Sequence, residues 1–192
     1  MNKKSMKTFG GIAVIVILIA GLLLATPMGT VSAYADGKGG PGGWGTTQGT
    51  GPSSAGTGAS LTPLSEAEKE ALSQAILEEY GALNLYNGVI VEFGNVTPFY
   101  RIARAEQQHV NVLIKQAAKY GVTVPENPGL TEAVTFNSLS EACSAGVAAE
   151  IADAALYDEL KPVTTHSDIV QVYTFLQNAS LNSHLSAFQA CE

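Results

Sequence analysis

The sequence predicts an all-α protein, a four-helix bundle with one long crossover between the second and third helices. Three observations support this fold class. After residue 60, apolar side chains recur every three or four positions, as they do on the buried face of a helix. Capping residues, glycines and prolines divide this part into four segments. The connection between the second and third segments has some 18 residues, enough to run the length of a bundle.

The first 33 residues have the plan of a secretory signal peptide. Three lysines precede an uncharged apolar run over 12–25, and small residues follow, with a cleavage site after Ala33 or Ala35. An uncleaved membrane anchor is the alternative, although the run is short for a span of about 20 residues. In both cases we expect export, to the cell surface or the extracellular space, or to the periplasm if the host has an outer membrane. Membrane contact is expected only through this segment, if it is uncleaved.

Residues 34–60 are predicted to form a flexible tether, and residues 61–192 the folded domain. The tether holds half of the 20 glycines and almost no apolar side chains, so burial cannot offset the entropy lost on ordering. Removal of residues 1–33 takes away three of the ten basic and none of the 17 acidic residues, which leaves a formal charge near −10. This charge argues against a nucleic-acid partner. The oligomeric state stays open, a homodimer included.

The first helix is predicted to begin after Ser65, which forms a capping box with Glu68, and to end at Gly94. Its apolar stripe reads Leu72, Ile76, Leu83, Tyr86 and Ile90. Glu79 occupies the one remaining position of that stripe, so we expect its carboxylate to point into the core. Glu78 is expected to face the flank or the solvent.

The second helix ends at Gly121, and Glu106 and His109 take two inward positions of its stripe. The apolar members of that stripe are Phe99, Ile102, Leu113, Ala117 and Tyr120. A carboxylate and an imidazole three residues apart lie on the same face of a helix and can bind one metal ion. Glu-x-x-His is also the inward ligand pair of di-metal carboxylate bundles. Because the preceding link is short, the first two helices are expected to be antiparallel neighbours.

The third and fourth helices repeat the pattern of an ionisable residue among apolar ones. The third begins after Ser138, ends near Pro162, and places Glu150 in a stripe with Cys143, Val147, Ala154 and Tyr157. Asp153 lies at the edge of this stripe, where it can be a ligand or an outer-shell partner. The fourth begins near Ser167 or Asp168, and its stripe reads Ile169, Tyr173, Leu176, Ser180, His184, Ala187 and Cys191.

Five ionisable side chains therefore fall inside apolar stripes: Glu79, Glu106, His109, Glu150 and His184. Unpaired burial would cost several kcal/mol for each, and a chain with 14% charged residues offers few buried basic partners. A bound cation is the simplest explanation. The alternative is that some stripes are misphased by one residue and that these groups face water. Tyr86 and Tyr157 are interpreted first as packing residues, with a ligand or second-shell role as the alternative.

From about Leu61 onward the chain resembles the ferritin-like superfamily, and more closely its exported branch, the domain of unknown function 2202 (DUF2202) family. The resemblance rests on four segments: EEYGALNLY (78–86), AEQQHV (105–110), GVAAEIAD (146–153) and NSHLSAF (182–188). It implies a di-metal site with Glu79, Glu106 and His109 in one half and with Glu150 and His184 in the other.

The sequence departs from the superfamily pattern at one position. That pattern has a second Glu-x-x-His in the fourth helix, but Leu181 stands three residues before His184. Asp153 is the candidate substitute for the carboxylate that is lacking.

Carboxylate and imidazole ligands suit iron, with manganese or zinc as the other candidates. The expected function is therefore that of an exported ferritin-like metal-binding protein. The resemblance implies a di-iron or di-manganese site with oxidase, peroxidase-like or ferroxidase chemistry. The alternative is a non-catalytic extracytoplasmic module that uses the bundle for metal binding or protein contact. The sequence assigns no catalytic residue, so whether the chain is an enzyme stays open.

Cys143 and Cys191 are predicted to form a disulfide. Exported chains meet oxidants that leave few thiols free, and this chain has two cysteines. Cys143 lies in the first turn of the third helix and Cys191 in the last turn of the fourth. A short link makes these helices antiparallel, so the two ends should meet. Two separate buried thiols are the alternative.

Overall fold

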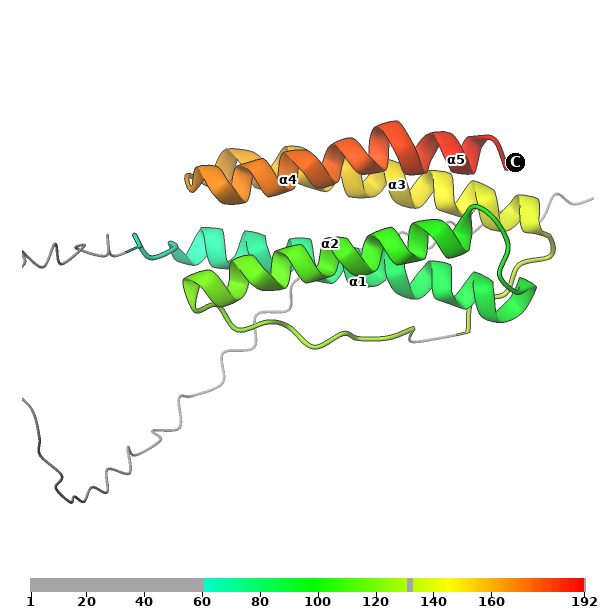
Figure 1. The fold of residues 1–192 in the computed structure, drawn as a ribbon, viewed down its shortest axis with the longest axis horizontal. Coiled ribbons are helices and arrows are strands. Elements are labelled where there is room, and N and C mark those ends of the chain that lie inside the picture. Colours follow the sequence, from blue (N-terminus) through cyan, green and yellow to red (C-terminus); the bar gives the residue numbers. More distant parts are fainter. Residues whose placement is uncertain (1–60, 131–132, 192) are drawn as a thin grey trace, which may run out of the picture. The chain divides into compact units, whose positions relative to one another are not determined.

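The computed structural model describes residues 61–130 and 133–191, and all regular secondary structure in this part is helical (Figure 1). The elements are α1 (Glu66–Phe93), α2 (Phe99–Tyr120), α3 (Leu139–Val163), α4 (Ser167–Ala179), the π-helix η1 (Ser180–His184) and α5 (Leu185–Gln189). The predicted all-α class is confirmed. The predicted signal peptide and tether, residues 1–33 and 34–60, lie outside the described residues. No helix in the described part is long and apolar enough to cross a membrane.

The described helices form four columns that lie side by side, the last made of α4, η1 and α5 in succession (Figure 1). α1 packs against α2 and α3, and α4 packs against α2 and α3. Each of these neighbouring pairs is antiparallel, whereas α2 and α3 run in the same direction. The chain therefore leaves α2 at one end of the columns and enters α3 at the other. A short turn could not make that connection.

The predicted capping box at the start of α1 is present, and its Glu68 also contacts the loop between α3 and α4. The backbone N–H of Ser65 donates to Glu68 Oε2 (2.9 Å), and the N–H of Glu68 donates to Ser65 Oγ (3.3 Å). The other carboxylate oxygen, Oε1, accepts the backbone N–H and the hydroxyl of Thr165 (2.8 Å each) and lies 2.7 Å from His166 Nδ1. Glu68 is thereby buried at this end of the columns.

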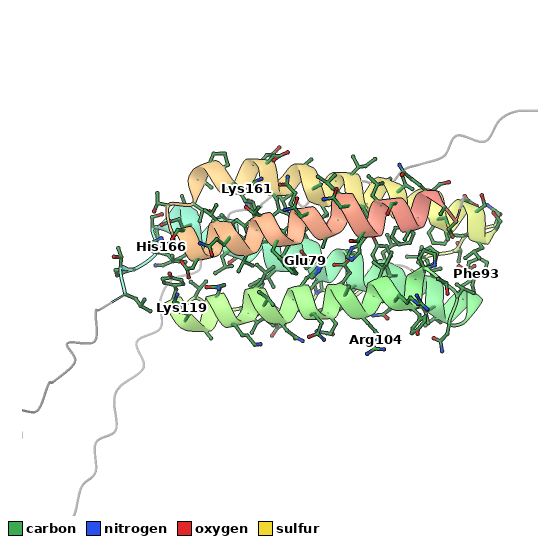
Figure 2. All side chains as sticks on the ribbon, turned by 45° about the horizontal axis from the view of Figure 1, so that its top comes forward. Glu79, Phe93, Arg104, Lys119, Lys161 and His166 are labelled. Carbon is green, nitrogen blue, oxygen red and sulfur yellow. A yellow bond between two sulfur atoms is a disulfide. The ribbon has the colours of Figure 1, made fainter. Side chains whose placement is uncertain are left out.

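A histidine in a short loop would ordinarily be solvated, but His166 is partly buried and contacts two other segments. Its side chain lies at the end of the columns (Figure 2), with Nδ1 against Glu68 and Nε2 3.0 Å from the carbonyl oxygen of Thr62. Both ring nitrogens face acceptors, so the geometry favours the doubly protonated imidazolium. The contact with Glu68 raises the pKa of His166 above its ordinary value.

The opposite end of the columns is held by the predicted disulfide and by an aromatic cluster. Cys143 and Cys191 are bonded, with their Cα atoms 5.8 Å apart. Phe188 of α5 packs against Tyr86 and Phe99, with ring centroids 5.0 Å apart in each pair. Its ring takes the space beside Gly146, where a Cβ atom would lie 2.6 Å from the ring. The last column is thus fixed against α1, α2 and α3 at this end.

The π-helix η1 changes which residues of the last column face inward. Beyond Gln177 the buried positions are Ser180, His184 and Phe188, which follow Leu176 at steps of four residues. A regular α-helix has 3.6 residues per turn, and a π-helical turn accommodates one extra residue. The predicted inward positions of Ala187 and Cys191 are therefore wrong, because both are only partly buried and Phe188 faces the core instead.

We predict that replacing both cysteines by serine lowers the free energy of unfolding by about 4 kcal/mol, because the disulfide closes a loop of 48 residues. Guanidinium denaturation followed by circular dichroism measures the loss. Wild-type protein with the disulfide reduced should match the double variant. Equal stability of the oxidised wild type and the variant would contradict the prediction.

We predict that the Glu68–His166 pair stabilises the fold most in weak acid. Burial alone would raise the pKa of Glu68, but its contacts with His166, Ser65 and Thr165 outweigh burial and lower it, so this contribution is lost as the pH falls below 4.5. The pKa of His166 is raised, so its contribution is complete below 6.5 and is lost as the pH rises through the folded-state value.

The stability difference between wild type and His166→Asn should therefore be larger at pH 5.5 than at pH 9. Urea denaturation at the two pH values measures it, and the other titrating groups cancel because both proteins contain them. A difference that does not change with pH would show that the contact is not ionic.

Candidate metal centre

The five ionisable residues predicted to face the core meet at mid-length of the columns, where Figure 2 labels Glu79. They come from all four columns, and every one of them is at most 6% exposed: Glu79, Glu106, His109, Glu150 and His184. They form two groups of three that share Glu106, and within each group the candidate ligand atoms lie within 4.8 Å of one another. The alternative of misphased stripes does not hold for these residues.

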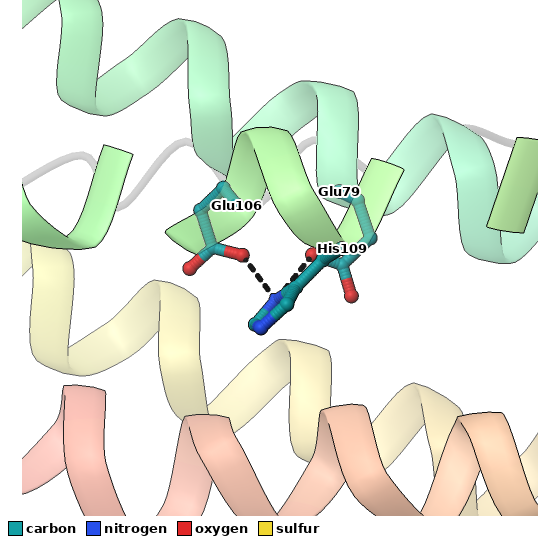
Figure 3. Close-up of side chains that lie close together, drawn as sticks. All are labelled: Glu79, Glu106 and His109. Carbon is teal, nitrogen blue, oxygen red and sulfur yellow. Dashed lines mark hydrogen bonds and ion pairs between the residues drawn. The ribbon is translucent and has the colours of Figure 1, made fainter. Parts of the chain in front are cut away.

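In the first group, Nδ1 of His109 faces two carboxylates (Figure 3). It lies 2.8 Å from Glu106 Oε2 on its own helix and 3.2 Å from Glu79 Oε2 on α1. The helix supplies Glu106 and His109 together because positions three apart share a face. One nitrogen and two oxygens thus converge from two helices.

The second group repeats this arrangement with the other oxygen of Glu106. Nδ1 of His184, the last residue of η1, lies 2.9 Å from Glu106 Oε1 and 3.3 Å from Glu150 Oε2. The two imidazole rings are stacked, with centroids 5.4 Å apart and planes 19° apart. The carboxylate of Glu106 therefore spans the two groups, one oxygen in each.

The spacing of these atoms fits a metal ion. Around a cation with ligands at about 2.1 Å, adjacent ligand atoms of an octahedron are about 3.0 Å apart. The four nitrogen–oxygen distances given above lie between 2.8 and 3.3 Å. Glu106 Oε1 and His184 Nδ1 are also buried without a hydrogen-bond partner among the described residues, because their contact lacks hydrogen-bond alignment. Buried Glu and His groups in this arrangement could hold a metal.

Each outer glutamate accepts a hydrogen bond from a buried tyrosine, and the two residues of each pair lie on the neighbouring helices α1 and α3. Tyr157 on α3 donates its hydroxyl to Glu79 Oε1, and Tyr86 on α1 donates to Glu150 Oε1, both at 2.5 Å. Burial and the adjacent carboxylates raise the pKa of both hydroxyls, which keeps them protonated as donors. The tyrosines therefore contact the site as well as packing the core, and each leaves one glutamate oxygen facing a histidine.

The tyrosine contacts show an internal repeat of glutamate and tyrosine that was not predicted from the sequence. Glu79 and Tyr86 are seven residues apart on α1, and Glu150 and Tyr157 are seven apart on α3. The two pairs are linked, because each tyrosine donates a hydrogen bond to the glutamate of the other helix. The equal spacing in two inward stripes was the available signal for this arrangement.

The carboxyl groups at the site outnumber its imidazoles. Burial raises the pKa of Glu79, and the charge of Asp153 raises it further, while burial also raises the pKa of Glu150. Burial would raise the pKa of Glu106 as well, but its contacts with His109 and His184 outweigh burial and hold it at about 2. None of the lysines and arginines in the described residues is buried. The two imidazoles are thus the positive groups available inside this part of the core.

The same carboxylates control the charge of the imidazoles when no metal is bound. Burial favours the neutral rings, but the contacts with Glu106 and the outer glutamates prevail and raise the pKa of His109 to about 10 and that of His184 to about 9. A metal ion that takes the Nδ1 atoms displaces these protons. Metal and protons therefore compete for one set of atoms.

Asp153 is buried near the site but belongs to neither group of three. It is 5% exposed, and its Oδ2 accepts the hydroxyl of Ser180 at 2.5 Å. Its Oδ1 is buried without a hydrogen-bond partner among the described residues. Glu78, expected at the flank or in solvent, is half-buried, and burial together with the charge of Glu150 raises its pKa.

Comparison with known proteins identifies structural neighbours but no family. No family model and no curated protein matches the sequence. A hypothetical protein, MJ0754, from Methanococcus jannaschii DSM 2661 has a similar structure, with a TM-score of 0.58 and 27% identity over 67% of this chain and 81% of that one. A conserved hypothetical protein, rv2844, from Mycobacterium tuberculosis has a TM-score of 0.57 and 16% identity over 66% of this chain and 98% of its own.

We predict that Tyr157→Phe weakens metal binding about 10- to 100-fold, because Glu79 loses the donor that orients it. Competition with a chromophoric chelator measures the affinity. Tyr80→Phe is the matched control, since Tyr80 packs partly buried on α1 and has no hydroxyl contact with these carboxylates. A Tyr157 variant with reduced stability but wild-type affinity would assign this tyrosine to packing alone.

Proposed function

We propose that this chain is an exported member of the ferritin-like superfamily whose helical bundle holds a carboxylate and histidine di-metal site. The site uses Glu79, Glu106, His109, Glu150 and His184. The order and directions of the helices support the bundle with one long crossover, because the two parallel columns α2 and α3 follow each other in the chain.

One observation carries the proposal: the carboxylate of Glu106 faces a different histidine with each of its oxygens, at 2.8 and 2.9 Å. Each histidine also faces a second glutamate from a neighbouring column. A packed core gains nothing from this concentration of ionisable groups, since burying them unpaired costs several kcal/mol each. Cations placed in the two groups would satisfy all of these atoms at once.

Iron is the metal we propose, with manganese and zinc as the competing cations. Mixed carboxylate and imidazole ligands suit these ions, and three ligand atoms in each group leave positions for a substrate. Bound iron would supply the electrons for reducing oxygen or peroxide, or would itself be the ferrous substrate of a ferroxidase. We propose oxidase, peroxidase-like or ferroxidase chemistry on this basis.

The side chains of the protein have separate tasks in such a site. Glu79 and Glu150 would each hold a cation with the oxygen that is not bonded to a tyrosine, while the tyrosine hydroxyl fixes the orientation of the carboxylate. Glu106 keeps the two halves at one level along the bundle axis. The surrounding core excludes water, since the five residues are all buried.

Two features support export. The N-terminal sequence has the plan of a secretory signal. The bond between Cys143 and Cys191 is of the kind that forms and persists in oxidising compartments.

We predict that Glu106→Ala combined with His109→Ala abolishes metal binding, because it removes ligand atoms from both groups. Elemental analysis of protein purified from its own host and desalted measures metal per chain. Gln107→Ala with Gln108→Ala is the matched control, since these neighbours on α2 are exposed. Unchanged metal content in the Glu106 and His109 variant would refute the site.

The chemistry is tested separately on the wild-type protein. Stoichiometric iron together with a peroxide-dependent change in absorbance supports an oxidoreductase. Bound metal that does not respond to peroxide or oxygen favours the non-catalytic module that is the alternative.

A further inference from the structure

The two halves of the site are unequal, and the inequality lies at η1. The internal repeat matches Glu79 with Glu150, Tyr86 with Tyr157, and His109 with His184. Glu106 is the one ligand without a carboxylate counterpart on the last column. By chain spacing its counterpart is Leu181, three residues before His184, but Leu181 is 42% exposed.

The π-helix places Ser180 at the inward position instead. Ser180 is 1% exposed and stands four residues before His184, whereas Glu106 stands three before His109. The extra residue of the π-helical turn accounts for the difference of one. Residue 180, the counterpart of Glu106 in the last column, is therefore a serine, and its hydroxyl donates a hydrogen bond to Asp153.

Asp153 brings a carboxylate to this position from the neighbouring column. It lies on α3 one turn after Glu150, and the hydroxyl of Ser180 holds its Oδ2. Its Oδ1 is buried and unpartnered among the described residues. A carboxylate oxygen buried without a donor is costly unless the group takes up a proton or a cation.

We propose that Asp153 is the fourth carboxylate of the metal centre, held by Ser180, and that with it the centre takes two divalent cations per chain. This inference rests on the proposed function. Glu79, Glu106, Glu150 and Asp153 carry four negative charges when deprotonated, and two neutral imidazoles add none, so two divalent cations balance the centre. Without Asp153 the three glutamates leave two such ions with an excess of positive charge inside the core.

Asp153 lies outside both groups of three in this structure, so its side chain would have to rotate to hold a cation. The hydroxyl of Ser180 holds Oδ2 of Asp153, and Oδ1 is the oxygen left to bind a cation. Its role differs from that of Glu78, which is half-buried and can be solvated at the edge of the core.

The test is the number of cations bound per chain. Metal-free protein is titrated without oxygen with Mn²⁺ and with Co²⁺, followed by calorimetry and, for cobalt, by visible absorption. Wild type should bind two ions, and Asp153→Asn should bind one, or bind the second at least tenfold more weakly. Glu159→Gln, which removes the same charge from the exposed face of α3, should bind two. A wild type that binds one ion, or an Asp153→Asn variant that matches it, would overturn the inference.

Metal-free stability separates a ligand from a structural residue. Asp153→Asn should unfold at the same or a higher temperature than wild type without metal, because it removes a buried negative charge. A variant that loses both the second ion and the metal-free stability would assign Asp153 to the scaffold and overturn the proposal. If Glu106→Ala with His109→Ala keeps its metal, the proposed function fails as well. If that variant loses its metal while Asp153→Asn does not, only the present inference fails.

The position of the fourth carboxylate can be tested by transplanting it. In the Asp153→Asn background, Ser180→Asp should restore the second ion, because residue 180 faces inward. Leu181→Glu restores the Glu-x-x-His spacing but places the carboxylate on the exposed side, so it should not restore binding. Recovery with Leu181→Glu in place of Ser180→Asp would show that the π-helix does not set the inward position.

Discussion

The carboxylate of Glu106 imposes the tightest constraint on this molecule, because its two oxygens contact histidines from two different columns. Those contacts require α2 and the last column to stay level to within a fraction of a helical turn. Glu79 and Glu150 extend the requirement to α1 and α3, each through a histidine and a tyrosine. Sliding one column by a single residue, about 1.5 Å, would break most of these contacts.

The two ends of the columns supply the alignment that the centre needs. At one end the buried carboxylate of Glu68 joins the first turn of α1 to the loop before α4. At the other, the disulfide and Phe188 fix α5 to α3 and to the aromatic residues of α1 and α2. Both devices restrain the last column along its axis. That column carries His184 within a π-helix, the segment whose hydrogen bonding is least regular.

The sequence predicts most of this arrangement, because helical periodicity reports burial directly. On α2 every predicted inward residue from Phe99 to Ala117 is buried, the two ligand candidates included. On the 28-residue α1 the predicted stripe drifts by one position at its end, where Val89 is buried and Ile90 only partly so. Alternate steps of three and four match 3.6 residues per turn only approximately, so errors accumulate along a long helix.

Periodicity could not reveal features that depend on contacts between elements. His166 meets Glu68 across 98 positions of the chain, and neither residue has a local pattern that indicates the other. The hydroxyls of Tyr86 and Tyr157 fall in core stripes, and spacing cannot show which polar atom each one reaches. The π-helix does have a sequence signal, because Leu176, Ser180, His184 and Phe188 are spaced four residues apart throughout. A stripe predicted with alternate steps of three and four residues does not distinguish this spacing from that of a regular α-helix.

The departures from ordinary helical design gather in one slice of the molecule, and this bears on why they persist. Buried acids that outnumber their basic partners, two buried tyrosine hydroxyls and a π-helical turn would each lower the stability of a bundle built only to fold. Replacing the acids with apolar residues of similar volume would be neutral or stabilising in a purely structural core. Here the exceptions contact one another, and the rest of the described core is largely apolar, with Glu68, Thr164 and Gln177 as its buried polar residues. Exceptions that converge in this way are typical of functional sites, where stability is given up locally for binding or chemistry.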